Sequence, residues 1–168
     1  MRRSSASCAA FATALIATLS LVSCAGIPVK RVDTVIHGAA AGDLSGELAE
    51  ATVSTLLSQA ELERVAREIF PLAAAEAGIA PAMGECRSDY ALWLHEDEYT
   101  IGLDRYSAVL CVLKLRSKAD GSVLATTIVS EETKLGLKSS GYVYAIVREA
   151  LRSLRFAASE KAARVAAK

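Results

Sequence analysis

The chain has 168 residues with 19 basic and 19 acidic side chains, an apolar share of 52% and only 5% aromatic residues. Its neutral net charge excludes the bulk electrostatic attraction on which nucleic-acid binding depends. The length is enough for one domain whose single core is filled mostly by aliphatic side chains.

The first 23 residues have the layout of a secretory signal. Arg2 and Arg3 precede an almost continuous apolar run over residues 8–22, and this order is typical of an export signal peptide. The run is shorter than the roughly 20 apolar residues that cross a bilayer, so a lasting transmembrane helix is the weaker alternative. Removing residues 1–23 leaves 17 basic and 19 acidic side chains, a net charge of −2.

The end of this run, Leu21-Val22-Ser23-Cys24, resembles a bacterial lipobox. In lipoproteins with this motif the Cys receives a diacylglyceryl group, the signal is cleaved before it, and the new amino terminus is usually acylated. The resemblance therefore implies lipidation of Cys24, including palmitate-type chains, and several acyl chains anchor a protein firmly. The alternative is a plain signal peptide with Cys24 an ordinary thiol. In lipoproteins of enteric-type bacteria an Asp after the Cys is the usual inner-membrane retention signal, and this chain has Ala25 there. In a host with two membranes the resemblance therefore favours the outer membrane, with the domain in the periplasm.

Residues 24–28 form a short tether before the first expected strand, residues 29–36. At about 3.5 Å per residue such a linker spans less than about 20 Å, so the domain lies close to the membrane. We expect a single domain over residues 29–157, followed by an alanine-rich, charged helical tail over residues 158–168.

Two helical segments are expected after the first strand. Gly42-Asp43 is a suitable cap for a helix whose apolar stripe is Leu44, Leu48, Ala51 and Thr55. Ser58 and Glu61 have the spacing of a capping box for a second helix. Pro71 predicts a kink or break in that helix, and Gly78 predicts its end.

The next segments, residues 90–101, 106–115 and 123–129, change to strand periodicity and predict an antiparallel meander. The first two are apolar enough to be buried on both faces. A turn at Leu103-Asp104 places Cys111 opposite about Asp97 and far from Cys86, which disfavours a disulfide between the two. A last helix begins at residues 139–141 and buries the stripe Val143, Val147, Ala150, Leu151 and Leu154.

These elements predict an α+β fold, with a four-stranded, mainly antiparallel sheet and helices packed on one face. The predicted order is β-α(α)-β-β-β-α. The sequence shows no internal repeat.

Two clusters of charged side chains are candidate sites. The run His95-Glu96-Asp97-Glu98 places His95 and Asp97 on one strand face, but two ligands fall short of the three protein donors that a metal site commonly has. A solvated hairpin end is the preferred interpretation, so no metal is predicted. Arg148, Arg152 and Arg155 are spaced as a helical stripe that is either a solvated face or a contact for lipid headgroups or an acidic partner.

No catalytic or cofactor motif is present. The sequence contains no Gly-x-Ser-x-Gly, no Cys-x-x-Cys and no phosphate-binding loop, and its only histidines are His37 and His95. We therefore predict no enzymatic activity and no cofactor.

With its lipobox and short tether, the predicted order of elements resembles small α/β envelope lipoproteins. These include the lipopolysaccharide-assembly lipoprotein, activators of penicillin-binding proteins, and curli-secretion lipoproteins. The resemblance is one of architecture, and only residues 21–24 match in motif. It implies a non-enzymatic accessory factor, anchored through Cys24, that docks on an envelope protein through a sheet edge or the arginine stripe. The alternative is a lipoprotein that binds a lipid or small amphiphile between sheet and helices.

Overall fold

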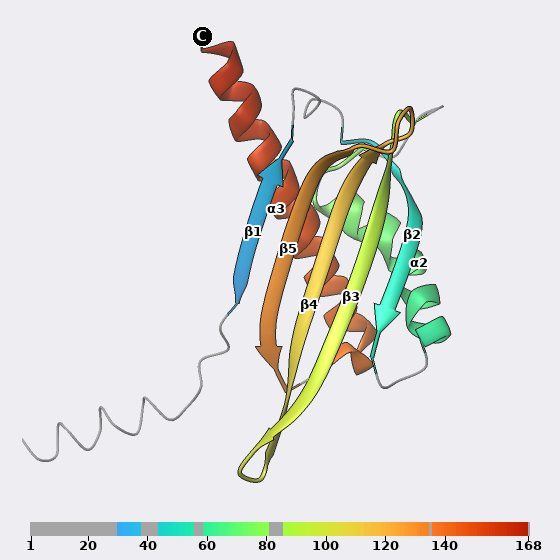
Figure 1. Cartoon of the computed structure of the whole chain (residues 1–168), viewed down its shortest axis with the longest axis vertical. Helices are drawn as coiled ribbons and strands as arrows, with labels where there is room; N and C mark the ends of the chain where they lie inside the picture. Colours follow the sequence, from blue (N-terminus) through green and yellow to red (C-terminus); the bar gives the residue numbers. More distant parts are fainter. Residues whose placement is uncertain (1–29, 38–43, 56–58, 81–85, 135, 168) are drawn as a thin grey trace, which may run out of the picture.

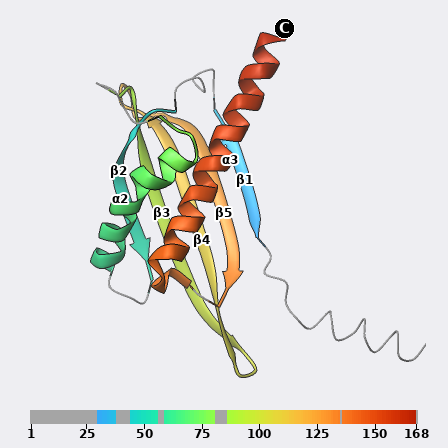
Figure 2. The same ribbon diagram turned by 180° about the vertical axis from the view of Figure 1, so that it is seen from behind.

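A computed structural model describes residues 30–37, 44–55, 59–80, 86–134 and 136–167 of the chain. Its centre is a five-stranded sheet with the spatial order β1-β5-β4-β3-β2. The elements along the chain are β1 (Arg31–Ile36), β2 (Glu47–Ser54), α2 (Gln59–Glu76), β3 (Ser88–Ile101), β4 (Asp104–Ser117), β5 (Val123–Thr133), the short 3-10 helix η1 (Gly136–Lys138) and α3 (Ser140–Ala166). Both long helices lie on the same face of the sheet (Figures 1 and 2). The α+β class and the one-sided helical layer are therefore confirmed.

The prediction of four strands was wrong, because the segment expected to form the first helix is strand β2. Its residues pair in parallel with β3, and a register shift lies between Leu48 and Glu50. Such a bulge adds one residue to the strand, so Leu48 and Ala51 are three residues apart and still contribute to the same core. Apolar residues three positions apart also lie on one face of a helix, which is why the sequence pattern predicted a helix here.

Helix α2 connects β2 to the parallel strand β3 and packs against β2 and α3. It continues through Pro71, so the predicted break does not occur. Its end is as predicted: Gly78 has φ +72°, and the N–H groups of Gly78 and Ile79 donate to the carbonyls of Ala75 and Ala74, each at 2.9 Å. This pair of hydrogen bonds is a Schellman motif, which favours glycine at the left-handed position.

Helix α3 crosses the sheet diagonally and contacts β1, β5 and β4 (Figure 2). Ser139 is its N-cap and accepts a hydrogen bond from the Tyr142 N–H, as predicted. The whole predicted stripe of α3 is buried, and the helix continues to Ala166. Neither of the described helices has the length and apolarity of a membrane span.

Strands β3 and β4 form a long hairpin whose closing pair is Ile101 with Asp104. The turn therefore lies at Gly102 and Leu103, and Cys111 faces Leu94 rather than Asp97. Cys111 is completely buried in the core, and burial raises the pKa of its thiol to about 12. No disulfide joins it to Cys86 in the described part of the chain.

Candidate functional site

One candidate surface is the face of the sheet opposite the helices (Figures 1 and 2). Along β3 the even-numbered residues from Tyr90 to Glu96 are buried, whereas the residues between them are not. This alternation corrects the expectation that β3 is buried on both faces: only one face is covered by helices.

An apolar row crosses the middle of the uncovered face. Trp93 on β3 lies opposite Val112 on β4, and Val112 lies opposite Ile128 on β5. Trp93 and Ile128 are each 39% exposed, and Val35 on the neighbouring strand β1 is 54% exposed. Large apolar side chains grouped on one face in this way are typical of contact surfaces for other molecules.

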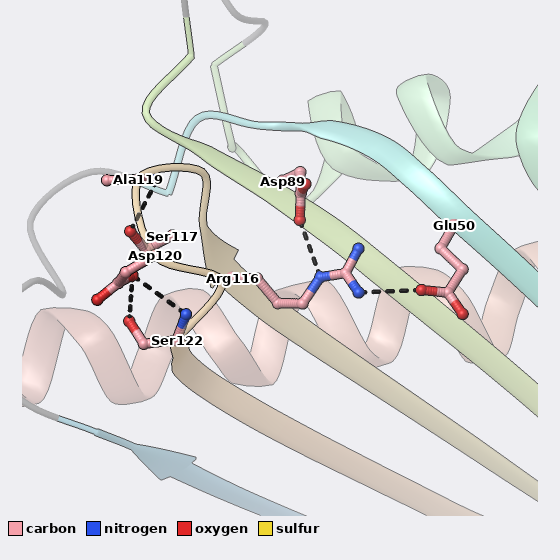
Figure 3. Close-up of polar contacts among 7 residues, drawn as sticks. All are labelled: Glu50, Asp89, Arg116, Ser117, Ala119, Asp120 and Ser122. Carbon is pink, nitrogen blue, oxygen red and sulfur yellow. Dashed lines mark hydrogen bonds and ion pairs between the residues drawn. The ribbon is translucent and has the colours of Figure 1, made fainter.

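One end of this face is held by an ion-pair network that connects three strands (Figure 3). The Nε of Arg116 on β4 donates to Oδ1 of Asp89 on β3 at 3.0 Å, and its Nη1 donates to Oε2 of Glu50 on β2 at 2.9 Å. The hydrogen bond with Asp89, supported by that with Glu50, raises the pKa of the guanidinium. The network therefore fixes the edge strand β2 to the centre of the sheet.

The adjoining β4–β5 turn is ordered by local hydrogen bonds, also drawn in Figure 3. Oδ1 of Asp120 accepts from the backbone N–H of Ser122 at 3.1 Å and from its hydroxyl at 2.8 Å. Hydrogen bonds with Ser117 and Ser122 hold the pKa of Asp120 below its usual value.

A shallow hollow of about 460 Å³ lies between the apolar row and the Arg116 network. Its lining includes the apolar side chains of Trp93, Val112 and Val123 and the charged side chains of Glu50, Lys114 and Arg116. Protein–protein interfaces commonly combine apolar and charged side chains and are enriched in Trp and Arg. The arrangement is suited to docking, and no described side chains there form a nucleophile–base pair.

The cluster at residues 95–98 is divided between the two faces of the sheet. His95 Nε2 and Asp97 Oδ2 are 3.0 Å apart on the uncovered face, as the alternation predicted. Within the described ranges no group of three or more His, Cys, Asp or Glu side chains is placed to bind a metal ion. The expectation that the whole run is solvated was wrong for Glu96, which is only 5% exposed.

Glu96 connects three elements on the helical side of the sheet. Its Oε1 accepts the buried backbone N–H of Leu137 in η1 at 3.2 Å, and its Oε2 accepts the hydroxyl of Thr55, just after β2, at 3.1 Å. Because Gly136 has no side chain, its backbone can lie against the carboxylate: a Cβ there would be 2.0 Å from Oε1. Glu96 is thus a structural anchor at the point where the β3–β4 hairpin leaves the helical layer.

The three arginines predicted as one stripe have different surroundings. Arg148 Nη1 forms an ion pair with Glu76 Oε2 at 2.9 Å, and its guanidinium lies 5.6 Å from the ring centre of Tyr144. Arg155 Nη1 donates to the carbonyl of Ala77 at 2.9 Å. Arg152 is exposed. Arg148 and Arg155 therefore connect α3 to the end of α2, and the stripe remains at the surface at Arg152 and Arg155.

A second cavity, of about 430 Å³, lies between β2 and α2. Leu48, Phe70, Pro71 and Ile79 line it, with the charged side chain of Arg67 at its border. Arg67 Nη1 also donates to the Leu48 carbonyl at 3.3 Å, which ties the helix to the sheet edge. This cavity is suited to an amphiphile, because one cation adjoins its apolar walls.

Sequence reasoning did not find the uncovered face or the Arg116 network. The alternation in β3 was visible, but Ala91, Trp93 and the apolar residues of β4 on the same face suggested burial on both sides. The network joins residues up to 66 positions apart, so no local pattern indicates it. Cys24, the predicted lipidation site, lies outside the described residues.

Comparison with known proteins gives a likeness of fold. No protein-family model matches the chain, and no curated protein matches it. Among solved structures, a PelC dodecamer from Paraburkholderia phytofirmans is similar at a TM-score of 0.53 and 16% identity, over 76% of this chain and 98% of that chain. A variant of the same protein gives a TM-score of 0.49 at 18% identity, with the same coverage of both chains. A PDZ domain protein from Parabacteroides distasonis gives 0.47 at 11% identity, over 74% of this chain and 36% of that chain. The chain thus shares its fold with PelC, and at 16% identity this similarity is one of fold alone.

Proposed function

We propose that this chain is a lipid-anchored, non-enzymatic accessory subunit of a bacterial envelope assembly, and that the uncovered sheet face docks on a protein partner. The observation that carries this proposal is the apolar row across that face, in which Trp93 and Ile128 are exposed and Val112 between them is half-buried. Burying apolar surface that is exposed to water gains about 25 cal/mol of free energy per Å². A partner surface would remove this row from water.

The charges around the row support a protein partner. Arg116, Asp89 and Glu50 are already fixed by one another, so docking beside them orders few additional side chains and loses little conformational entropy. Their mixed signs favour a partner surface that also carries both signs. PelC, which shares the fold, is described as a dodecamer. A second copy of this chain is therefore the first partner to test.

The docking proposal is tested by placing a photo-crosslinking phenylalanine derivative at Trp93 in cells that make the full chain. We expect a crosslinked product at this position, with either a second copy or a defined envelope protein identified by mass spectrometry. Glu160, on the exposed surface of α3, provides the matched control position, where the same product should be absent. Equal yields at both positions, or no protein product at Trp93, would refute docking through this face.

The anchor is tested separately. Cys24→Ala should abolish metabolic labelling with palmitate and release the protein from the membrane fraction, because the acceptor thiol is lost. Labelling that persists in the Cys24→Ala protein would show that the lipobox assignment is wrong.

A second candidate function is the binding of a small amphiphile, and the β2–α2 cavity favours it. Its apolar walls match an acyl chain, and Arg67 at its border matches an anionic headgroup. Native mass spectrometry of the protein extracted from membranes should then show one bound lipid that Ala74→Phe removes by filling the cavity. A protein that carries no ligand under these conditions would leave docking as the function.

A further inference from the structure

The β3–β4 hairpin ends in the most exposed apolar residues of the described sheet. Leu103 is 104% exposed and Ile101 is 64% exposed. Gly102, with φ +62°, begins the two-residue turn and has the positive φ that such hairpin turns require. Nothing lies within 4 Å of a Cβ at this glycine. The tip therefore presents two aliphatic side chains to its surroundings.

This tip stands on a projecting arm. The pairing of β4 with β5 ends at Ser107 and Thr133, whereas β3 and β4 remain paired to Ile101 and Asp104. The arm is visible at the lower end of the sheet in Figure 1. An exposed apolar tip on a long, regular hairpin gains no stability from the fold, which suggests that its apolar residues contact something outside the domain.

The side chains behind the tip are those found where proteins meet a lipid surface. Tyr99 and Tyr106 stack at 5.9 Å between ring centres, and Lys134 lies 5.2 Å from the ring centre of Tyr106. Tyrosines are enriched at the headgroup level because the ring is apolar and the hydroxyl is polar.

The charges around the arm are nearly balanced. Asp104 is paired with Lys134 at 3.2 Å, and Glu98 is paired with Lys138. Arg105 adds one positive charge, and Asp97 and Glu132, which lie in one cross-strand row, add two negative charges. The region therefore carries a net charge of −1, and two of its four carboxylates form ion pairs with lysines.

The position of the arm also agrees with the proposed anchor. Arg31, the first residue of β1, lies in the same cross-strand row as Ser130, Leu110 and His95. From His95 the strand continues for six residues to Ile101, so the tip lies about 20 Å beyond the start of β1. Seven residue steps separate Cys24 from Arg31, and they span at most about 25 Å. The tether is therefore long enough for the tip to touch the membrane that holds Cys24.

We infer that the hairpin tip, Ile101 and Leu103, inserts into the lipid interface beside the anchor and sets the orientation of the domain on the membrane. This inference rests on the proposed anchoring through Cys24. Two fixed points, the acylated Cys24 and the tip, would hold the strands at a steep angle to the membrane plane. The opposite end of the sheet, with the β4–β5 turn, would then face away from the lipid (Figure 1).

The test measures the depth of a single tryptophan in the full lipidated protein. The chain has one natural tryptophan, so Trp93→Phe gives a background in which Leu103→Trp places a fluorophore at the tip. Ala119→Trp, in the exposed β4–β5 turn, is the matched control at the other end. Both proteins are reconstituted in phosphatidylethanolamine–phosphatidylglycerol vesicles with or without brominated acyl chains, and mass spectrometry of the Cys24 peptide reports acylation.

We expect brominated lipid to quench the Leu103→Trp protein and to leave the Ala119→Trp protein unchanged. Adding Ile101→Asp should remove the quenching, because a carboxylate makes the tip polar. The circular dichroism spectrum should not change, because the side chain at position 101 is exposed in the fold. Acylated protein with equal, weak quenching at both positions overturns the inference and leaves the anchor intact. A blue-shifted emission without quenching overturns it as well, since the tip is then buried in protein. A Cys24 peptide without acyl mass refutes the anchor itself and, with it, the inference.

Discussion

The buried carboxylate of Glu96 gives the sharpest test of how the hairpin arm is held. Glu96 is 5% exposed and accepts the N–H of Leu137, a residue with no exposed surface. It also accepts the hydroxyl of Thr55. Replacing Glu96 by alanine leaves the Leu137 N–H buried without this acceptor and opens a space beside Gly136.

The cost of this change follows from two terms. An unsatisfied buried donor costs about 1–3 kcal/mol, and each methylene removed from a buried position costs about 0.8 kcal/mol. The carboxylate itself is expensive to bury, and its removal offsets part of the loss. We expect Glu96→Ala to lower the free energy of unfolding by about 2–3 kcal/mol. Glu96→Gln keeps an acceptor oxygen for Leu137 and an amide for the Thr55 hydroxyl, so we expect it to be much milder.

The assay is urea unfolding of the purified protein followed by circular dichroism, with the denaturant slope compared between variants. Glu98→Ala is the matched control, because Glu98 is exposed and its ion pair with Lys138 lies at the surface. We expect no resolvable change there. If Glu96→Ala is as stable as the parent, the anchoring role is refuted. If Glu96→Gln loses as much as Glu96→Ala, the charge matters rather than the acceptor.

Three further outcomes are expected. Gly136→Ala should lower the free energy of unfolding by more than the roughly 1–2 kcal/mol that a left-handed backbone costs a residue with a side chain, because the added Cβ meets Glu96. Gly121 also has a positive φ, +70°, but open space around it, so Gly121→Ala should show the backbone cost alone in the same urea assay. Burial raises the pKa of Cys111 to about 12, so this thiol should resist iodoacetamide at pH 8 until urea unfolds the protein, and rapid alkylation of the folded protein would contradict this. Because the thiol ionises at a lower pH in the unfolded chain than in the folded one, the free energy of unfolding should also fall as the pH rises above about 9. Arg155→Ala should lower the melting temperature by removing the hydrogen bond to the end of α2, whereas Arg152→Ala should not, and equal effects would show that the two arginines share one role.

Local signals in the sequence were sufficient for most elements of the fold. The Ser139 cap and the apolar period predicted α3, because both depend on neighbours within one or two helical turns. Gly78 predicted the end of α2 for a similar reason, since its positive φ is set by the chain itself. The three strands of the meander followed from their periodicity and the turns between them. The absence of a catalytic motif and the resemblance of residues 21–24 to a lipobox are also read from the sequence alone.

The tertiary structure decided which residues these elements bring together. Strand β2 exists because β3 supplies a pairing edge and a bulge aligns Leu48 and Ala51 with the core, and that partner lies about forty residues away. Glu96 is buried because η1 and Thr55 converge on it, although its neighbours in sequence are all charged or polar. Arg148 and Arg155 became contacts between α2 and α3 because α2 ends beside them. The uncovered face was likewise hidden in the sequence, because an apolar strand does not specify how many of its faces the rest of the chain will cover.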